Sequence, residues 1–299
     1  MIPPKQSVYG MEISMIIAGN DKDLVVENIK NAANSRQFYN KVEVNDPNIS
    51  EETKKKLIEK YLNEHDTVKY KLKCWSACRM VDVATGIVNK KSRIIGQENI
   101  KGVTGGAIIT SNHFNPDDST IIRKCIRKSS MKRLFIVSQD TNMAMSGFFG
   151  YLLNYADIIP ITDNNEYMKT KFPHLIKSVL KANQYVLIYP EQEMWLNYKK
   201  PRPPKRGAYY YAARFMVPVI SCFVEMKNTY EKATEQFYKV EYILHVLPTI
   251  YPDPDKSVRE NSVIMMKKDY EQKKAAYEAA YGKKLDYDFE YDDIAGLIH

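Results

Sequence analysis

The sequence lacks the long apolar run that a membrane-spanning helix requires. None of its 299 residues lies in a stretch of roughly 18–20 apolar side chains, the length needed to cross a bilayer. No window resembles a signal peptide either. We therefore expect a cytoplasmic protein that meets a membrane, if at all, from outside the bilayer.

The chain also has few cysteines and histidines. Its four cysteines, at 74, 78, 125 and 222, show neither the zinc nor the thioredoxin spacing, so we expect reduced and buried thiols. Its five histidines show no H-x-x-x-H or H-x-E pattern. The sequence therefore predicts no bound metal.

Two common catalytic motifs are missing as well. Neither a G-x-S-x-G elbow nor a Walker A loop is present, which argues against covalent hydrolases and nucleotide hydrolases. The formal net charge of +8 instead suggests a partner that carries negative charge. By charge alone, nucleic acid, anionic lipid and an acidic protein remain possible.

Hydrophobic periodicity divides the chain into two parts. Residues 1–88 read as a mostly helical appendage, with helical patterns at 21–33 and 48–65, the second capped by Ser50. Residues 89–299 alternate short apolar strands with helices, which predicts an α/β domain with a mixed, mostly parallel sheet flanked by helices. The expected strands are 107–110, 134–138, 156–161, 185–190, 217–226 and 239–248.

Three further segments carry local signals. Residues 173–183 predict a helix that begins at Pro173 and ends at an asparagine. Residues 257–282 predict another, with a capping box formed by Ser257 and Glu260. The acidic and aromatic segment 286–293 is either a solvated end or a strap on the basic body, and we favour the solvated end.

The chemistry centres on "SNHFNPDDS", residues 111–119, where a buried strand ends at His113. Ligands of open α/β sheets bind where strands end at their carboxyl edge. Pro116 suits the first turn of a following helix, and the two aspartates after it favour the positive end of that helix. The helix has an apolar arc and a basic arc. The basic arc, with two cations beyond it, comprises Arg123, Lys124, Arg127, Lys128, Lys132 and Arg133.

His113 and Asp118 are spaced so that they can turn toward each other. A carboxylate on one ring nitrogen fixes the tautomer, so the other nitrogen can deprotonate a hydroxyl. No serine nucleophile accompanies the pair, which indicates that the hydroxyl belongs to a substrate. The alternative interpretation is a loop histidine followed by aspartates that only cap a helix.

A second stretch, "YPEQEMWLNYKKPRPPKRGA" (189–208), follows another strand end. With it, the sequence resembles the glycerolipid acyltransferase family, whose best-known members are 1-acylglycerol-3-phosphate acyltransferases. "NHFNPDD" resembles the N-H-x4-D block of that family, and "YPEQEMW" resembles its F-P-E-G-T-R block. "KRGA" (205–208) and "VPVI" (217–220) resemble the two blocks that follow, and the resemblance covers roughly residues 92–280.

This resemblance implies specific roles. His113 would be the general base and Asp118 its orienting partner, and an acceptor hydroxyl would attack the thioester of acyl-CoA or acyl-carrier protein without an acyl-enzyme. Glu191 would help to hold the acceptor. The matched blocks imply further substrate contacts at Asn112, Pro190 and Gly207. The acyl donor would be a substrate, so no separate cofactor is expected, and the pathway would be lipid metabolism, specifically phospholipid biosynthesis.

The chain departs from the family pattern at the positions that usually bind the phosphate of the acceptor. Gln192, Glu193 and Met194 replace the glycine, threonine and arginine of the third block, and Thr162 and Asp163 stand where an arginine is usual. Cations of the following segment could substitute, since no acid lies among them. They are Lys199, Lys200, Arg202, Lys205 and Arg206. We therefore expect an acceptor other than simple lysophosphatidic acid, either a lysophospholipid with a larger head group or a glycolipid.

The sequence thus predicts a lipid O-acyltransferase at the inner face of the membrane, drawn to anionic lipid or to an acidic carrier protein by the basic arc. One alternative is a non-catalytic protein that binds membrane surfaces on the same scaffold. A nucleic-acid binder has only the charge in its favour and matches no known module, so we expect no nucleic-acid partner.

Overall fold

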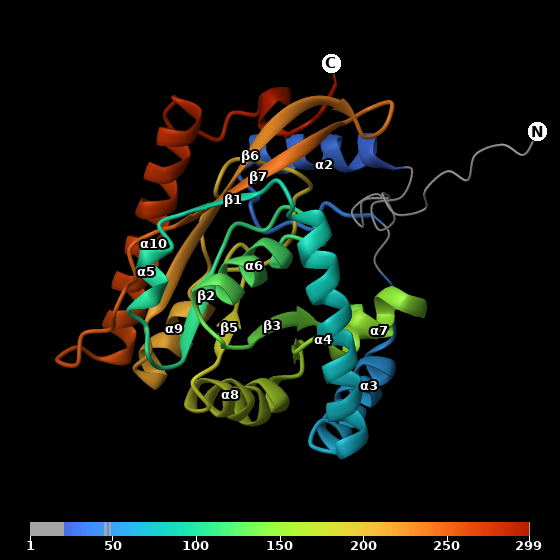
Figure 1. Ribbon diagram of the computed structural model, residues 1–299, viewed down its shortest axis with the longest axis vertical. Coiled ribbons are helices and arrows are strands. Elements are labelled where there is room, and N and C mark those ends of the chain that lie inside the picture. Colours follow the sequence, from blue (N-terminus) through green and yellow to red (C-terminus); the bar gives the residue numbers. More distant parts are fainter. Residues whose placement is uncertain (1–20, 45–46, 48, 299) are drawn as a thin grey trace, which may run out of the picture.

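The structure is a computed structural model that describes residues 21–44, 47 and 49–298. The first 20 residues of the expected appendage lie outside the described part. Helices and strands alternate along most of the described chain, as Figure 1 shows. The helices are α2 (Lys22–Asn34), α3 (Glu51–Glu64), α4 (Val68–Val88), α5 (Glu98–Lys101), α6 (Ser119–Ser129), α7 (Gly147–Tyr155), α8 (Asn165–Lys181), α9 (Gly207–Phe215) and α10 (Val258–Tyr281), with 3-10 turns η1 (Asp140–Ala144) and η2 (Tyr291–Asp293).

The strands form one seven-stranded sheet, whose order is β1-β7-β6-β2-β5-β3-β4. They are β1 (Arg93–Ile95), β2 (Ala107–Thr110), β3 (Leu134–Gln139), β4 (Ile158–Ile161), β5 (Tyr185–Leu187), β6 (Val219–Lys232) and β7 (Tyr238–Val246). β2 pairs in parallel with both β5 and β6, and β3 pairs in parallel with β4 and β5. Only β7 and its parallel partner β1 run against the others, since β7 pairs antiparallel with β6. The predicted mixed, mostly parallel α/β sheet is confirmed.

Alternating side chains of β2 divide the core into two layers. Ile108 faces a cluster that contains residues of α8 and α9, whereas Ala107 and Ile109 face a cluster that contains residues of α5 and α6. Successive side chains of a strand point to opposite faces of its sheet, so helices cover both faces of β2. This explains why the strand is apolar along its whole length.

The N-terminal helices pack against the rest of the chain. α4 contacts α6 and α7, and α3 contacts η1. α2 contributes Val25, Val26 and Ile29 to a third cluster that includes Trp195 and Ile294. The boundary that we placed at residues 88 and 89 remains a prediction.

Two expectations about helix starts were wrong. α8 begins at Asn165, not at Pro173, because the side chain of Asn164 accepts a hydrogen bond from the Tyr167 amide and caps the helix. α6 begins at Ser119, so Pro116 lies in the turn before it. By contrast, the capping box of Ser257 and Glu260 at the start of α10 is confirmed.

The acidic segment 286–293 is a strap, so the favoured interpretation of a solvated end was wrong. Lys200, only 2% exposed, forms ion pairs with Asp293 at 2.8 Å and with Asp286 at 3.2 Å. The strap continues into Ala295, whose amide donates to the carbonyl of Asn197 over 2.8 Å. The alternation of aromatic and acidic residues therefore serves burial and ion pairing at once.

The basic arc of α6 and the loop after it is partly internal: Arg127, Lys128 and Arg133 are exposed, whereas the other three cations are buried or half-buried. Arg123 is buried and donates to the Ala156 carbonyl, and Lys132 donates to the carbonyls of Val103 and Thr104. Arg127 pairs with Asp82 and Arg133 pairs with Asp157. These four cations are thus engaged within the protein, and the attraction of the arc to an anionic surface stays a prediction. Among the described residues, no helix is long and apolar enough to cross a bilayer.

Candidate active site

β2 places the predicted site at the centre of the sheet. Two parallel neighbours, β5 and β6, flank β2, and the chain continues beyond its carboxyl end to His113. Glu191 follows β5, so the two predicted blocks meet at one edge of the sheet. The amide of His113 donates to Oε2 of Glu191 over 3.3 Å, which shows that they are in contact.

His113 and Asp118 form the expected pair. Nδ1 of His113 lies 2.7 Å from Oδ2 of Asp118, and the same oxygen accepts from the amides of Phe114 at 3.0 Å and Asn115 at 3.4 Å. A carboxylate accepts hydrogen bonds, so this geometry puts the ring proton on Nδ1 and leaves the Nε2 lone pair available. Asp118 therefore orients the imidazole rather than capping α6, and no side-chain cap bond forms at that helix start.

Asn112 anchors the loop that carries His113. Its Nδ2 donates to the carbonyl of Val224 over 3.1 Å, and its Oδ1 accepts from the amide of Val224 over 2.8 Å. The side chain is buried, and both of its polar atoms are used in this way. The structure thus gives Asn112 a role in holding the loop, and a contact with substrate remains only a prediction.

Tyr189 is a residue of the site that the sequence analysis did not identify. Its ring stacks on His113 with centroids 4.0 Å apart and an interplanar angle of 14°, and its hydroxyl donates to Oδ1 of Asp118. Burial, and secondly the neighbouring Asp118, raise the pKa of the Tyr189 phenol well above its usual range. The only available signal was a tyrosine in place of the phenylalanine of the F-P-E-G pattern.

Glu191 is buried and paired with Arg202. The carboxylate accepts from the backbone amide of Arg202 at 2.9 Å and lies 3.0 Å from its Nη2. The guanidinium also donates to the carbonyl of Phe38 at 2.8 Å and lies 4.4 Å from the ring of Trp195. Arg202 is therefore part of the scaffold, not a free phosphate ligand as we predicted.

The remaining cations of the 199–206 segment divide in the same way. Lys199 donates to the Asp292 carbonyl, and Lys200 is held by the strap. Lys205 and Arg206 are exposed, with the Nζ of Lys205 3.7 Å from the centroid of the Tyr39 ring. The expectation of five available cations is thus corrected to two.

Pro190 and Gly207 both lie near the start of α9. The carbonyl of Pro190 accepts a hydrogen bond of 2.7 Å from the amide of Lys205, and Gly207 is the first residue of the helix. A Cβ at Gly207 would have no neighbour within 4 Å, so internal packing does not require glycine there. The predicted substrate contacts of Pro190, Lys205, Arg206 and Gly207 remain predictions.

Gln192 has a backbone conformation that favours glycine. Its φ is +67°, in the left-handed region, at the position where the family pattern has glycine. The turn is therefore kept although the glycine is not. Glu193 beside it accepts from Nε2 of Gln139 over 3.1 Å, and Asp163 lies near Lys54, 3.8 Å away.

The site as a whole holds a solvent-accessible imidazole on a rigid frame. In the described ranges, no three His, Cys, Asp or Glu side chains gather in a way that could hold a metal ion. The loop that carries His113 is held by a segment about 80 residues later in the sequence. The Trp195 amide donates to the His113 carbonyl, and the Asn197 amide donates to the Phe114 carbonyl. A preorganised base of this kind suits proton abstraction from a substrate hydroxyl.

The chain is similar to a solved structure and matches a protein family. Among solved structures, the 1-acyl-sn-glycerophosphate (LPA) acyltransferase PlsC from Thermotoga maritima is similar, with a TM-score of 0.48 and 14% sequence identity over 88% of this chain and 97% of that chain. No curated protein has a matching sequence. Residues 91–225 match the family described as Acyltransferase, and this range contains His113, Asp118 and Glu191. This match identifies an acyltransferase domain at residues 91–225, and it supports the predicted resemblance to the glycerolipid acyltransferases.

Proposed function

We propose that the chain transfers a fatty acyl group from acyl-CoA or acyl-carrier protein to a hydroxyl of a lysophospholipid or glycolipid. His113 is the general base in this proposal. The observation that carries it is the 2.7 Å contact between Nδ1 of His113 and Oδ2 of Asp118. It supports a fixed tautomer in which Nε2 can accept a proton.

The chemical step needs no covalent intermediate on the protein. Nε2 of His113 takes the proton of the acceptor hydroxyl while its oxygen attacks the thioester carbonyl. A C–O bond forms, the C–S bond breaks, and the departing thiolate takes the proton from the imidazolium. Because thioesters are already activated, positioning and base catalysis can supply much of the rate.

The chain offers a matched control for testing this base. His245 also contacts a carboxylate, with 2.7 Å between its Nε2 and Oε2 of Glu225, and both histidine side chains are 21% exposed. His113→Ala should lower the turnover of thioester release by about 10²–10⁴-fold. His245→Ala should leave it within a few-fold of the unsubstituted enzyme, because His245 lies on β7 outside the site.

The assay should use both donors and a panel of lysophospholipids and glycolipids, with the mass of each product measured. A folded His113→Ala variant with near-normal rates would contradict base catalysis. If neither donor releases thiol with any acceptor, the chain is instead the non-catalytic membrane-binding protein of the alternative interpretation.

The proposed acceptor is anionic but is not simple lysophosphatidic acid. Arg206 borders a surface hollow together with Arg214 and Arg259, which supports recognition of a phosphate-bearing head group near α9. Glu193 adds negative charge beside Glu191, which disfavours a dianionic phosphate monoester. A kcat/KM that is highest for lysophosphatidic acid would contradict this choice.

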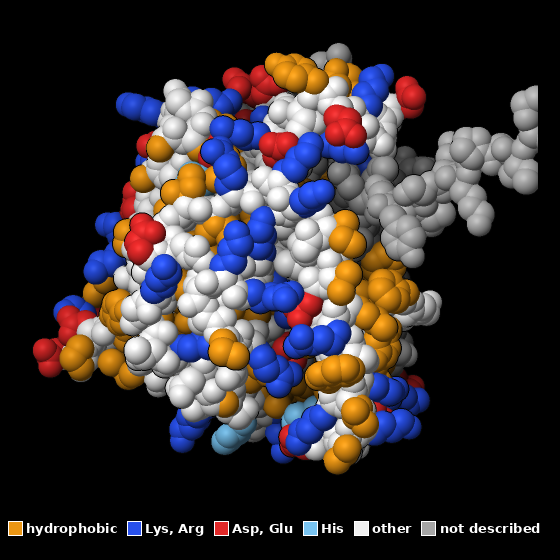
Figure 2. Space-filling view, in the orientation of Figure 1, with side chains coloured by type: hydrophobic (Ala, Val, Ile, Leu, Met, Phe, Trp, Pro, Cys, Tyr) orange, Lys and Arg blue, Asp and Glu red, His pale blue; other side chains and the backbone are white. Residues whose placement is uncertain are grey.

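We also propose that the protein binds the inner face of the membrane peripherally through α4. Large apolar side chains recur every three, four or eight residues along the helix and remain exposed, and Figure 2 shows hydrophobic side chains along the line of α4. They are Val68, Leu72, Trp75, Val83 and Ile87. The cations Lys69, Lys71 and Arg79 lie on the same helix, and this combination suits an anionic bilayer.

Liposome co-sedimentation tests the α4 surface. Leu72→Ser combined with Val83→Ser should greatly reduce binding to anionic vesicles. Tyr230→Ser removes a fully exposed aromatic side chain, more exposed than either α4 residue, from β6 and should not change binding. Equal loss in both variants would argue against a specific membrane face on α4.

A further inference from the structure

A large cavity lies away from the site of His113. It has a volume of about 1060 Å³ and is lined by residues of α4, α6 and α8 and by the amino ends of β3 and β4. Arg133, Asp157 and Gln184 border it, and each comes just before a strand of the parallel set. His113 follows the carboxyl end of a strand in the same set, so the cavity and the base lie at opposite edges of the sheet.

The lining of this cavity is predominantly positive. Three carboxylates, Asp66, Asp82 and Asp157, face twice as many cations. Asp157 is bound by Arg133, and Asp82 is bound by Arg127. The cations are Lys71, Arg79, Arg123, Arg127, Lys132 and Arg133.

The two thiols that line the cavity add no negative charge. Burial raises the pKa of Cys74 to about 11 and that of Cys78 to about 12, so both remain protonated at neutral pH. The cavity therefore keeps its excess of positive charge.

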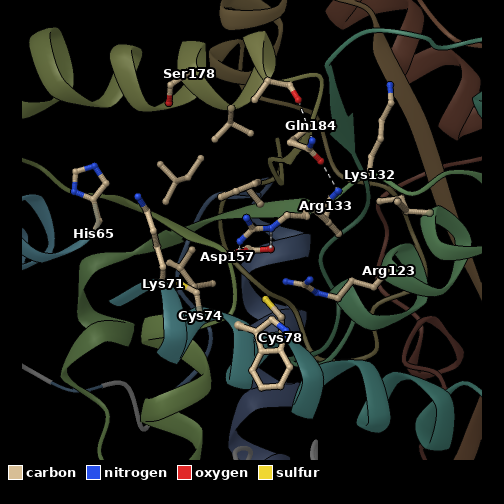
Figure 3. Close-up of a pocket in the computed structure, with 18 of the residues that line it drawn as sticks. His65, Lys71, Cys74, Cys78, Arg123, Lys132, Arg133, Asp157, Ser178 and Gln184 are labelled. Carbon is tan, nitrogen blue, oxygen red and sulfur yellow. Dashed lines mark hydrogen bonds and ion pairs between the residues drawn. The ribbon is translucent and has the colours of Figure 1, made fainter. Parts of the chain in front are cut away.

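Arg123 is the most informative residue of the lining. It is only 6% exposed, and its Nη2 donates to the Ala156 carbonyl over 2.8 Å. Its Nε is buried without a hydrogen-bond partner in the described structure, and Figure 3 shows the guanidinium directed into the cavity beside Cys78. A buried donor of a charged group without a partner is costly, which indicates that an external acceptor completes its hydrogen bonding.

The rest of the cavity is suited to an apolar tail. Phe135 and Ile159 of the sheet and Leu175 and Val179 of α8 contribute aliphatic and aromatic surface. At the rim, Trp75 is 64% exposed and Met131 is fully exposed. Trp75 also belongs to the apolar face of α4, so the mouth of the cavity adjoins the surface that we assign to the membrane.

We propose that this cavity binds a phosphate-bearing amphiphile, with the phosphate on Arg123 and Lys71 and the acyl chains along α8. The volume slightly exceeds that of sites for drug-sized ligands, which bury most of a small molecule in about 300–1,000 Å³. This site is separate from the catalytic one, and the proposal does not depend on the reaction that His113 performs.

Tryptophan fluorescence provides a direct readout. The chain has two tryptophans, Trp75 at the rim and Trp195, which is fully buried elsewhere. Dihexanoyl phosphatidic acid, used below the concentration at which it aggregates, should change the emission saturably. Dihexanoylglycerol, which lacks the phosphate, should have at most a weak effect at the same concentrations.

Two variants on one helix test the assignment. Lys71→Glu alters the cavity, whereas Lys69→Glu makes the same charge change two residues away on an exposed position that does not line it. Loss of a charge-assisted hydrogen bond should weaken binding by about tenfold or more in Lys71→Glu and much less in Lys69→Glu. Arg123→Gln should weaken binding similarly, with its folding checked by thermal unfolding.

Each remaining outcome counts against the proposal. Equal effects of the two lysine variants would show that phosphatidic acid is attracted only by general charge. Binding of dihexanoylglycerol as tight as that of phosphatidic acid would remove the role of the phosphate. Inorganic phosphate that binds as tightly as the lipid would show that the site takes the free anion and not an amphiphile. Loss of binding in His113→Ala but not in Lys71→Glu would place the lipid at the catalytic site.

Discussion

The ring of Tyr189 lies flat against the imidazole of His113, and its hydroxyl donates to Asp118, the carboxylate that orients that imidazole. One side chain thus fixes both members of the pair. His113 contacts one oxygen of Asp118 and Tyr189 the other, so rotation of the carboxylate would break both of these contacts as well as those from the two backbone amides. Tyr189 is therefore a positioning residue for the proposed base.

Tyr189→Phe removes the hydroxyl but keeps the stacked ring. Because a buried carboxylate oxygen then loses its donor, we expect the free energy of unfolding to fall by about 1–3 kcal/mol. We expect kcat to fall less than tenfold with KM unchanged, since the His113 contact persists. Tyr189→Leu, which also removes the ring, should lower kcat further. Chemical denaturation and steady-state kinetics test both variants, and equal kcat values for them would argue against a role for the stacked ring.

Glu191→Gln removes the charge that pairs with buried Arg202. An uncompensated buried charge costs about 3–5 kcal/mol, so the main effect should be a large loss of stability. The KM for the acceptor should stay nearly constant when rates are corrected for folded protein. If KM rises strongly while the unfolding midpoint is unchanged, Glu191 contacts the acceptor directly, as the sequence predicted.

Gln192→Gly relieves the left-handed backbone at residue 192. A non-glycine residue in this region costs roughly 1–2 kcal/mol, part of which the greater flexibility of unfolded glycine offsets. We therefore expect a small gain in stability, up to about 1 kcal/mol. Gln192→Val should be destabilising, because β-branched residues tolerate this conformation poorly. Thermal unfolding of the two variants distinguishes strain from a purely side-chain effect.

Asp293→Asn weakens the buried ion pair that holds the strap to Lys200. Breaking a buried pair on one side costs about 3–5 kcal/mol, and the partly exposed Asp286 can offset some of this loss. Asp288→Asn is the matched control, since its side chain is exposed and pairs with Arg36 at the surface. Urea unfolding should show a clear loss for the first variant and little change for the second.

Stability should decline at alkaline pH because buried tyrosines hold their protons. Burial raises the pKa of Tyr189 and of Tyr209 well above 10, and neighbouring aspartates add to the effect. Above about pH 10 the unfolded chain releases these protons while the folded chain keeps them, so unfolding becomes easier as pH rises. Each such tyrosine should remove roughly 1 kcal/mol per pH unit above 10. Stability that stays constant from pH 9 to pH 11 would contradict this.

Local patterns predicted much of the fold. The strand at 107–110 was predicted with its observed bounds because it is short, apolar and followed by a turn. The N-cap role of Ser50 is also confirmed, since a cap depends on residues within one helical turn. His113 and Asp118 were brought together as predicted because only five positions separate them.

The errors involved partners that are distant in sequence. From the sequence, Lys200 was predicted to be a free cation. Its carboxylate partners, Asp286 and Asp293, lie 86 and 93 residues later in the strap. Arg123 was likewise predicted to be a solvated residue of the basic arc, but it is buried and donates to the carbonyl of Ala156, 33 residues later. Counting charges cannot show which of them pair within the fold, and this limited the prediction of the substrate-binding cations.

The strap also links the site of His113 to a segment about 180 residues later in the sequence. Residues 195–197 join the loop of His113 on one side and the strap near Ala295 on the other. A variant truncated before residue 286 would therefore lack the strap contacts that support residues 195–197, and with them one wall of the frame around His113.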